Sequence, residues 1–363
     1  MERKTLFAAV PIIILLTIFF ATTVNQNVVR ADSSYNPWDH DSNPKTPDAD
    51  TNGWTISGET VLDKDMYFDG DGITIDGDDF TLDLNGYSII GTGTGIGVKL
   101  VGRADVIVDG GTVRNFETGI YLENSHDNFV TYMLIEENTF GIYLFDFSEW
   151  NRIDFNVIRE NNDGIFAIYH CNLNFIRGNL IQENSNDGIQ LIGCNENKIG
   201  GNRIEDNQRH GIKLFGWIDG ELFEHPCDNN FVTSNVLSNN EHGLYIMDES
   251  EYNQIQSNSI SKNEFGVYFD ASAGNPDNNV ISGNSICKNG VGVRIKMVED
   301  PPQTNVLVFN SIFDNREWDV MAGSHTKANF NWWGDEEGPA VGEDVSEVYV
   351  HFEPWLLRET LGE

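Results

Sequence analysis

The stretch GIYLENSHDNFVTYMLIEENTFGIYL, residues 119–144, begins and ends on the same tetrapeptide. Variants of this Gly-Ile-x-Leu motif return at intervals of 22 to 26 residues, with one interval of 32. They start at Gly164, Gly188, Gly211, Gly243, Gly266 and Gly292. A recurring period of this length is typical of repeat proteins, in which each period forms one structural unit.

Two asparagine motifs lie between successive copies of the tetrapeptide. Asn-x-Ile/Val/Leu starts at Asn128, Asn151, Asn174, Asn197, Asn230, Asn253, Asn279 and Asn305. Asn-x-Ile/Leu-x-x-Asn starts at Asn156, Asn179, Asn202, Asn235, Asn258, Asn284 and Asn310. Each period therefore has three short segments of alternating apolar residues, which suit strands of three to five residues better than helices. We expect the Asn and Gly between them to occupy turns that need a left-handed backbone.

Such strands bury their inward Ile and Leu only by stacking on the next coil. We therefore predict an all-β fold, a single-stranded right-handed parallel β-helix of about 10–12 coils with three short strands per coil. Stacked coils lie ~4.8 Å apart, so equivalent asparagines should hydrogen-bond to one another in ladders. Leucine-rich repeats have a similar period but need far more Leu and one strand per repeat.

The ends of the chain differ from the repeats. Residues 1–31 combine a charged start, an apolar run and small residues before Asp32, which predicts a signal peptide or an N-terminal anchor. Residues 32–52 are rich in Asp, Ser, Asn and Pro and predict a flexible linker. The β-helix is expected over 53–324, and the aperiodic, aromatic segment 325–363 is expected to be its C-terminal cap.

The chain is strongly acidic, with 57 Asp and Glu against 22 Lys and Arg and a net charge of −35. Such a surface repels phosphate backbones and excludes nucleic acid as a partner. Contact with a membrane is expected only through an uncleaved N-terminal segment. The acidic run from Asp69 to Asp79 suggests calcium, but it lacks a calcium loop and is more typical of Asp-Gly turns.

The repeat resembles the parallel β-helix repeat of the pectin-lyase-like superfamily. The entry segment from Asp69 to Gly86 and the exit segment Asn331-Trp332-Trp333-Gly334 with Pro354-Trp355-Leu356 are similar to those of its NosD-like branch. The resemblance covers about residues 53–357. It implies a prokaryotic exported protein, and the branch is named after an accessory protein of copper-site assembly in nitrous-oxide reductase. The superfamily also includes polysaccharide lyases, glycosidases and epimerases.

Stacking places the outward residues of the Gly-Ile-x-Leu segments in one line, here called the sheet column. Its members are Tyr121, Tyr143, Phe166, Gln190, Lys213, Tyr245, Tyr268 and Arg294. Five aromatic rings beside polar donors could bind a glycan. Aromatic residues also favour outward strand positions because they pair across rungs, so a purely structural role is the alternative.

The residue before each glycine forms a second line, here called the pre-glycine column. It contains Thr118, Phe140, Asp163, Asp187, His210, His242 and Phe265. Asp163, Asp187, His210 and His242 are candidates for acid–base catalysis or for holding a divalent metal. The insertion after Gly211, with Trp217 as a further ligand-binding candidate, could overhang them as a lid. The alternative is that turns simply favour Asp and His there.

Small residues form a third line, which contains Ser125, Ser148, Cys171, Cys194, Cys227 and Ser250. The pattern predicts a buried position filled by hydroxyls or thiols. A Cys171–Cys194 disulfide is one alternative, and copper(I) binding by the three thiols is another. Cys287 is expected at an outward position by itself.

Three functions remain open from the sequence. The first is an exported surface or periplasmic protein, a monomer, that binds or processes a polysaccharide along a sheet face. The second is a NosD-like accessory protein in copper-site assembly. The third is a non-catalytic structural or adhesive module.

Overall fold

A computed structural model describes residues 53–219, 223–272, 274, 276–296, 305–323, 325–340, 342, 344–345 and 350–359. The predicted targeting segment 1–31 and linker 32–52 lie outside these residues. The described residues contain strands and turns but no α-helix. None of the described segments is therefore a helix long and apolar enough to cross a membrane.

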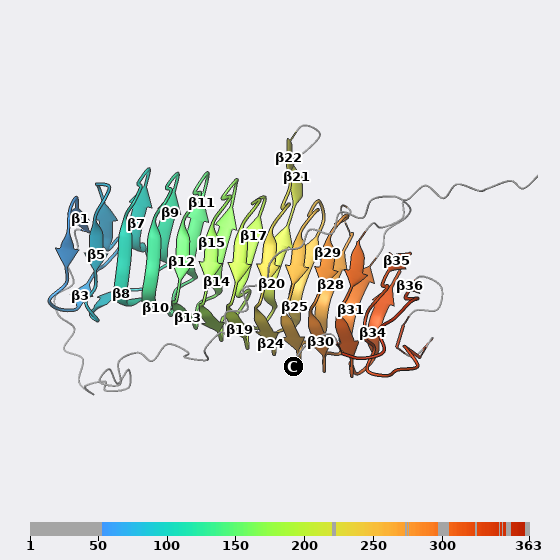
Figure 1. Cartoon of the computed structure of the whole chain (residues 1–363). Coiled ribbons are helices and arrows are strands. Elements are labelled where there is room, and N and C mark those ends of the chain that lie inside the picture. Colours follow the sequence, from blue (N-terminus) through green and yellow to red (C-terminus); the bar gives the residue numbers. More distant parts are fainter. Residues whose placement is uncertain are drawn as a thin grey trace, which may run out of the picture. The chain divides into compact units, whose positions relative to one another are not determined.

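One strand of each coil contributes to a parallel sheet of 12 strands, here called the long sheet (Figure 1). Its strands, in order, are β1 (Trp54–Ile56), β4 (Ile73–Ile75), β7 (Ile96–Val101), β9 (Thr118–Glu123), β11 (Phe140–Phe145), β14 (Asp163–Ile168), β17 (Ile189–Ile192), β20 (His210–Phe215), β25 (His242–Met247), β28 (Phe265–Asp270), β31 (Val291–Lys296) and β34 (Trp318–Ala322). The predicted parallel β-helix is confirmed, with about 12 turns.

The remaining coil strands form two further parallel stacks, which β8 (Ile107–Arg114) and β10 (Phe129–Glu136) both span. The second stack adds β2 (Thr60–Val61), β5 (Thr81–Asp83), β12 (Arg152–Asp154), β15 (Phe175–Arg177), β18 (Lys198–Gly200), β23 (Phe231–Thr233), β26 (Gln254–Gln256), β29 (Val280–Ser282), β32 (Val306–Val308), β35 (Thr326–Lys327) and β36 (Val350–His351). The third adds β3 (Met66–Tyr67), β6 (Ser88–Ile90), β13 (Val157–Arg159), β16 (Leu180–Gln182), β19 (Arg203–Glu205), β24 (Val236–Ser238), β27 (Ser259–Ser261), β30 (Ser285–Cys287) and β33 (Ser311–Phe313).

The interior is filled by stacked aliphatic side chains. Ile153 pairs with Ile176, and Ile176 pairs with Ile199, one coil further along. All three are almost completely buried. Because each coil places the same side chain over its counterpart, the core is one continuous column of Ile, Leu and Val that no single coil could form alone.

Three asparagine ladders hold the turns together. At Asn179 the backbone N–H and the side-chain Nδ2 both donate to Oδ1 of Asn202, each over 3.0 Å. The same Nδ2 also donates to the carbonyl of Ile153 at 2.8 Å. Each ladder amide is buried, so its polar atoms are satisfied by the coils on either side rather than by water.

The left-handed backbone lies one residue earlier than the sequence suggested. Many of the positive φ angles belong to the residue before a ladder asparagine, such as Glu137 (58°), Glu160 (55°) and Glu183 (56°). The repeat glycines have no positive φ. A Cβ on Gly141 would lie 2.5 Å from the carbonyl oxygen of Gly164, so these glycines are needed because the coils approach so closely.

Parallel pairing continues into the last part of the chain. β35 pairs with β32, and β36 pairs with β35. Trp333 is 4% exposed within the core, and the indole N–H of Trp355 donates to the carbonyl of Glu336 at 3.2 Å. These contacts cover the apolar end of the column that the last coils would otherwise expose.

Candidate functional site

The sheet column has the register that the repeat spacing predicts. Tyr121 pairs with Tyr143, and the pairing continues unbroken coil by coil to Arg294. Because the strands are parallel and in register, residues spread over more than 170 positions of sequence lie in one line along the rod. The long sheet therefore brings all the predicted ligand-binding residues together except Trp217.

Two aromatic clusters occupy this line and are separated by a polar gap. In the first, the ring of Tyr143 lies 5.4 Å from that of Tyr121 and 5.0 Å from that of Phe166. In the second, the rings of Tyr245 and Tyr268 are 5.3 Å apart. Gln190 and Lys213 fill the gap. The rings are half-buried, because each leans edge-on against its neighbour.

The pre-glycine column runs beside this line, and its centre is a buried hydrogen-bonded pair. Nδ1 of His210 lies 2.6 Å from Oδ1 of Asp187, which also accepts the backbone N–H of His210 at 3.2 Å. Asp187 is completely buried. Burial alone would raise the pKa of Asp187, but the hydrogen bond from His210 outweighs it and lowers the pKa. Asp187 therefore fixes the orientation and tautomer of the imidazole.

Asp163 has a different role from Asp187. Its Oδ1 accepts hydrogen bonds from Nδ2 of Asn186 at 2.6 Å and from the backbone N–H of Asp187 at 3.2 Å. Its Oδ2 accepts from Nδ2 of Asn162 at 2.9 Å. Burial raises the pKa of Asp163. These bonds tie the turns of two coils together and give both carboxylate oxygens of Asp163 partners within the protein.

Lys213 and Gln190 connect the sheet column to Asp187. With its amide oriented to satisfy both neighbours, Gln190 donates to Oδ2 of Asp187 at 3.1 Å and accepts from Nζ of Lys213 at 3.3 Å. Burial lowers the pKa of Lys213, although the charge of Asp187 acts in the opposite direction. The polar gap is thus a connected chain from Lys213 through Gln190 and Asp187 to His210.

His242 lies one coil beyond His210, directly opposite it in the sheet register. The two imidazole rings are 4.9 Å apart, and His210 also stacks on Tyr245 at 4.5 Å. His242 is 6% exposed, and Glu241 beside it is exposed. The structure therefore brings Asp163, Asp187, His210 and His242 together as predicted; the catalytic role proposed for them stays a prediction.

The insertion does not form a lid over these residues. It is an antiparallel hairpin of β21 (Trp217–Asp219) and β22 (Phe223–His225) that projects from the coils (Figure 1). It leaves the end of β20, whereas His210 begins that strand. At about 3.3 Å per residue the two sites are about 17 Å apart. The ring of His225 instead lies 5.4 Å from that of His170, at the far turn.

The cysteine line is confirmed as a buried position. Cys171, Cys194 and Cys227 are completely buried and free, so the Cys171–Cys194 disulfide is absent. Their thiols donate to backbone carbonyls, as the hydroxyl of Ser148 does in a neighbouring coil. Burial raises the pKa of Cys227 to about 12 and that of Cys194 well above its usual range. Protonated thiols committed to carbonyls do not fit copper, which binds the thiolate. Cys287 is half-exposed, as expected.

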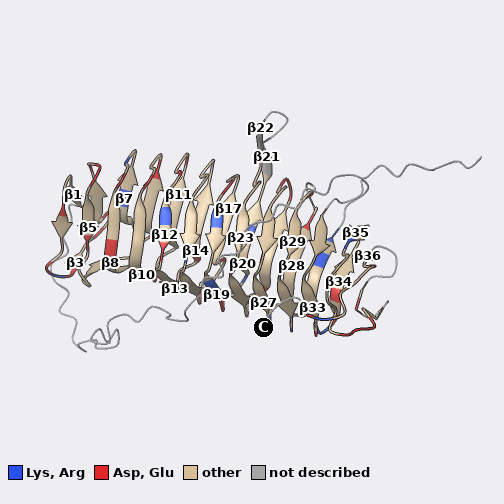
Figure 2. Ribbon diagram, viewed as in Figure 1, with Lys and Arg blue, Asp and Glu red and all other residues tan. Residues whose placement is uncertain are grey.

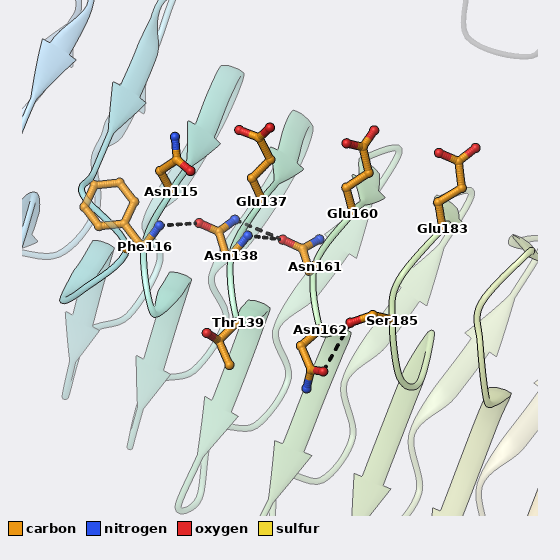
Figure 3. A pocket seen from close by; sticks show the side chains of 11 residues that line it. Asn115, Phe116, Glu137, Asn138, Thr139, Glu160, Asn161, Asn162, Glu183 and Ser185 are labelled. Carbon is orange, nitrogen blue, oxygen red and sulfur yellow. Dashed lines mark hydrogen bonds between the residues drawn. The ribbon is translucent and has the colours of Figure 1, made fainter. Parts of the chain in front are cut away.

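A row of glutamates borders an open pocket of about 610 Å³ that the sequence reasoning missed. Glu137, Glu160 and Glu183 stand side by side on successive coils, above the ladder asparagines (Figure 3). Asn162 lines this pocket and also donates to Asp163. The signal was present in the sequence, since the three glutamates are spaced 23 residues apart.

Exposed aromatic residues at a turn were also missed. Tyr132 is 58% exposed and stacks on Phe155 with ring centres 5.7 Å apart. Both have positive φ, at the position that Ser234 and Ser257 occupy in later coils. The acidic run behaves as turns, as expected: Oδ1 of Asp71 accepts the backbone N–H of Ile96 at 3.0 Å.

These features define a class: an acidic parallel β-helix with an aromatic and histidine-bearing face on its long sheet. The family described as "Periplasmic copper-binding protein (NosD)" has a sequence model that matches residues 52–219 and 215–339. The chain therefore belongs to the NosD family.

Solved structures with the same fold are similar in shape but distant in sequence. The A-module of the mannuronan C-5 epimerase AlgE6 of Azotobacter vinelandii has a TM-score of 0.53 at 16% identity, over 84% of this chain and 90% of that one. A mutant of the periplasmic alginate epimerase AlgG has a TM-score of 0.54 at 13% identity, over 83% and 75%. The Dettilon tailspike protein has 0.52 at 14%, over 78% and 61%. These likenesses show the fold alone. No curated protein matches the sequence.

Proposed function

We propose that this protein is an exported β-helix that binds a neutral polysaccharide along the sheet column of its long sheet. The observation that carries the proposal is the pair of aromatic clusters on either side of the Gln190–Lys213 gap. Aromatic faces pack against the apolar faces of sugars, while the ammonium group of Lys213 between the clusters can donate to hydroxyls. The periplasmic description of the family supports export.

The charge distribution favours a neutral ligand. Basic residues are few and scattered along the rod, whereas acidic residues lie at many of its turns (Figure 2). An anionic polysaccharide would meet this surface with its net charge of −35 and be repelled at low salt. The row of glutamates offers acceptors for hydroxyl groups near the same edge of the sheet.

The first prediction concerns the aromatic clusters. Tyr143→Ala and Tyr245→Ala should each weaken polysaccharide binding about tenfold, because each removes a ring from one cluster. Tyr245→Phe should bind nearly as well, since it keeps the ring and loses only the hydroxyl that donates to Asp270 at 2.7 Å. Affinity electrophoresis and calorimetry against neutral and acidic polysaccharides measure both effects.

A matched control lies outside the sheet column. Tyr132→Ser replaces an exposed ring by the residue that Ser234 and Ser257 place at the same turn, so it should fold and bind normally. If no polysaccharide of the panel binds saturably, the result contradicts the proposal and favours a structural or adhesive module. Loss of binding in Tyr132→Ser alone would locate the glycan at the turns instead.

The family description favours a second candidate function, the handling of copper in the periplasm. The buried thiols of Cys171, Cys194 and Cys227 donate to backbone carbonyls and do not support this candidate. His210 and His242 offer two imidazoles, and Glu241 offers a carboxylate. This set of nitrogen and oxygen ligands fits a copper(II) or zinc ion. An ion held there would supply a Lewis acid at the edge of the long sheet.

A further inference from the structure

We infer that His210, Glu241 and His242 form a binding site for one divalent transition-metal ion of the zinc or copper(II) class. Each side chain offers one ligand atom, and these atoms lie within 4.8 Å of one another. Glu241 and His242 are consecutive, and the parallel register places His210 opposite His242 on the preceding coil. The inference does not depend on glycan binding.

The buried nitrogen of His242 points to a missing partner. The side chain is 8% exposed, yet its Nδ1 makes no hydrogen bond. Buried polar atoms are nearly always paired, so an orphaned one indicates a ligand. The ring cannot turn away easily, because Phe265 and Tyr268 stack on it at 5.1 Å each.

His210 is already oriented as a metal ligand would be. Its Nδ1 is engaged by Oδ1 of Asp187 at 2.6 Å, which leaves Nε2 as the nitrogen that can donate a lone pair. Metal-binding histidines usually bond their second nitrogen to a carboxylate or carbonyl, which fixes the ring and makes it a stronger ligand. Gln190 in turn holds the other oxygen of Asp187. Asp187 is therefore a positioning residue rather than a ligand.

Glu241 closes the site from the solvent side. Its Oε1 lies 4.0 Å from Nδ1 of His242, and its exposed side chain can rotate to shorten that distance. Bonds of 2.0–2.2 Å to zinc require the three donors to draw together by about 1 Å. Two imidazoles with one carboxylate suit zinc or copper(II), whereas calcium takes six to eight oxygens. The negative charges of Asp187 and Glu241 offset Arg209 and Lys213, which lie close by.

The test is metal binding by the purified, metal-stripped exported chain. The exposed pair His325 and His351, whose ring nitrogens are 2.9 Å apart, could also chelate a metal, so the experiment uses a His325→Ala/His351→Ala background. Calorimetry with zinc sulfate and copper(II) chloride should show one ion per chain and much weaker binding of calcium chloride. Glu241→Gln and His242→Gln should each weaken binding at least tenfold, and Asp187→Asn by 10- to 100-fold.

Two further measurements make the result specific to these residues. His126→Ala, an exposed histidine elsewhere on the rod, should bind as the background does. Electron paramagnetic resonance of the copper(II) form should show coupling to two imidazole nitrogens, and to one in His242→Gln. Circular dichroism checks folding, and Glu241 is exposed, so its variant is expected to fold normally.

Two outcomes would overturn the inference. One is the absence of saturable zinc or copper(II) binding. The other is an affinity that Glu241→Gln and His242→Gln leave unchanged. Calcium binding as tight as that of zinc would overturn the assignment of the metal class. None of these three results bears on polysaccharide binding, which Tyr143→Ala and Tyr245→Ala test separately.

Discussion

One asparagine ladder runs from Asn138 to Asn315, and Asp319 ends it with a carboxylate instead of an amide. Asn315 donates to its Oδ1 through Nδ2 at 2.7 Å and through its backbone N–H at 3.3 Å. The side chain is 4% exposed, and burial raises its pKa to about 7 in spite of these bonds. The folded chain therefore prefers this carboxyl in its neutral form.

The second prediction follows from the sign of this shift. An unfolded Asp has a pKa near 3.9, so between about pH 4 and pH 7 the folded state binds the extra proton. This group's contribution to the free energy of unfolding therefore falls as the pH rises through that window. Asp319→Asn, which mimics the neutral acid, should be about 2–4 kcal/mol more stable than the parent at pH 8 and similar at pH 4.

Urea unfolding at pH 4, 6 and 8 measures this difference. Both chains carry the same remaining acidic residues, so the comparison cancels their common contribution. A parent–variant difference that stays constant across the three pH values would show that Asp319 does not titrate with a raised pKa.

At the scale of the element, the ladder rather than the single hydrogen bond is the unit of stability. Asn202 lies in the middle of its ladder: it accepts two bonds from Asn179 and donates to Asn235 and to the carbonyl of Ile176. Removing its amide leaves buried donors and acceptors on both neighbouring coils without partners. Each such group costs about 1–3 kcal/mol.

The third prediction is that Asn202→Ala lowers the free energy of unfolding by about 3 kcal/mol or more. Asn162→Ala provides a control, since this asparagine is exposed and water can replace its bonds to Asp163 and Ser185. Its effect should stay near 1 kcal/mol or less. Equal effects from the two substitutions, in urea unfolding followed by circular dichroism, would show that the ladder adds nothing beyond its separate bonds.

At the scale of the whole molecule, the hairpin β21–β22 is an addition to an otherwise regular rod. In the preceding coil, one residue, Gly193, separates Ile192 from Cys194. In the next coil, Gly216 and the inserted residues 217–226 separate the equivalent Phe215 and Cys227. Removing residues 217–226 would restore that one-residue spacing. β20 and β25 already pair directly, so the coils on either side remain in contact.

The fourth prediction is that deletion of residues 217–226 leaves a folded rod whose melting temperature changes by a few degrees at most. Zinc and copper(II) binding should also be unchanged, because the hairpin lies at the opposite end of β20 from His210. Circular dichroism and calorimetry of the deleted chain measure both. A metal affinity reduced tenfold would mean that the hairpin reaches the histidines after all.

Much of the fold and of the candidate site could be predicted from the sequence, because the nearly constant length of the repeat shows which residues of successive coils are stacked. Tyr121 and Tyr143, or His210 and His242, become neighbours as soon as their offset from the repeat glycine is equal. The reason for the glycine was wrong, since close approach of coils rather than positive φ requires it. Periodicity identifies a special position but not the physical constraint behind it.

The sequence by itself determined the β-helix, its register and the columns, because stacked coils contact only their neighbours and translation brings like residues together. The tertiary structure alone decided that Asp187 is buried against His210, that Nδ1 of His242 has no partner, and that Glu241 completes the cluster. It also placed the hairpin at the far end of β20. A repeat fixes where each backbone position lies, whereas side-chain direction, burial and pairing depend on the neighbours that differ from coil to coil.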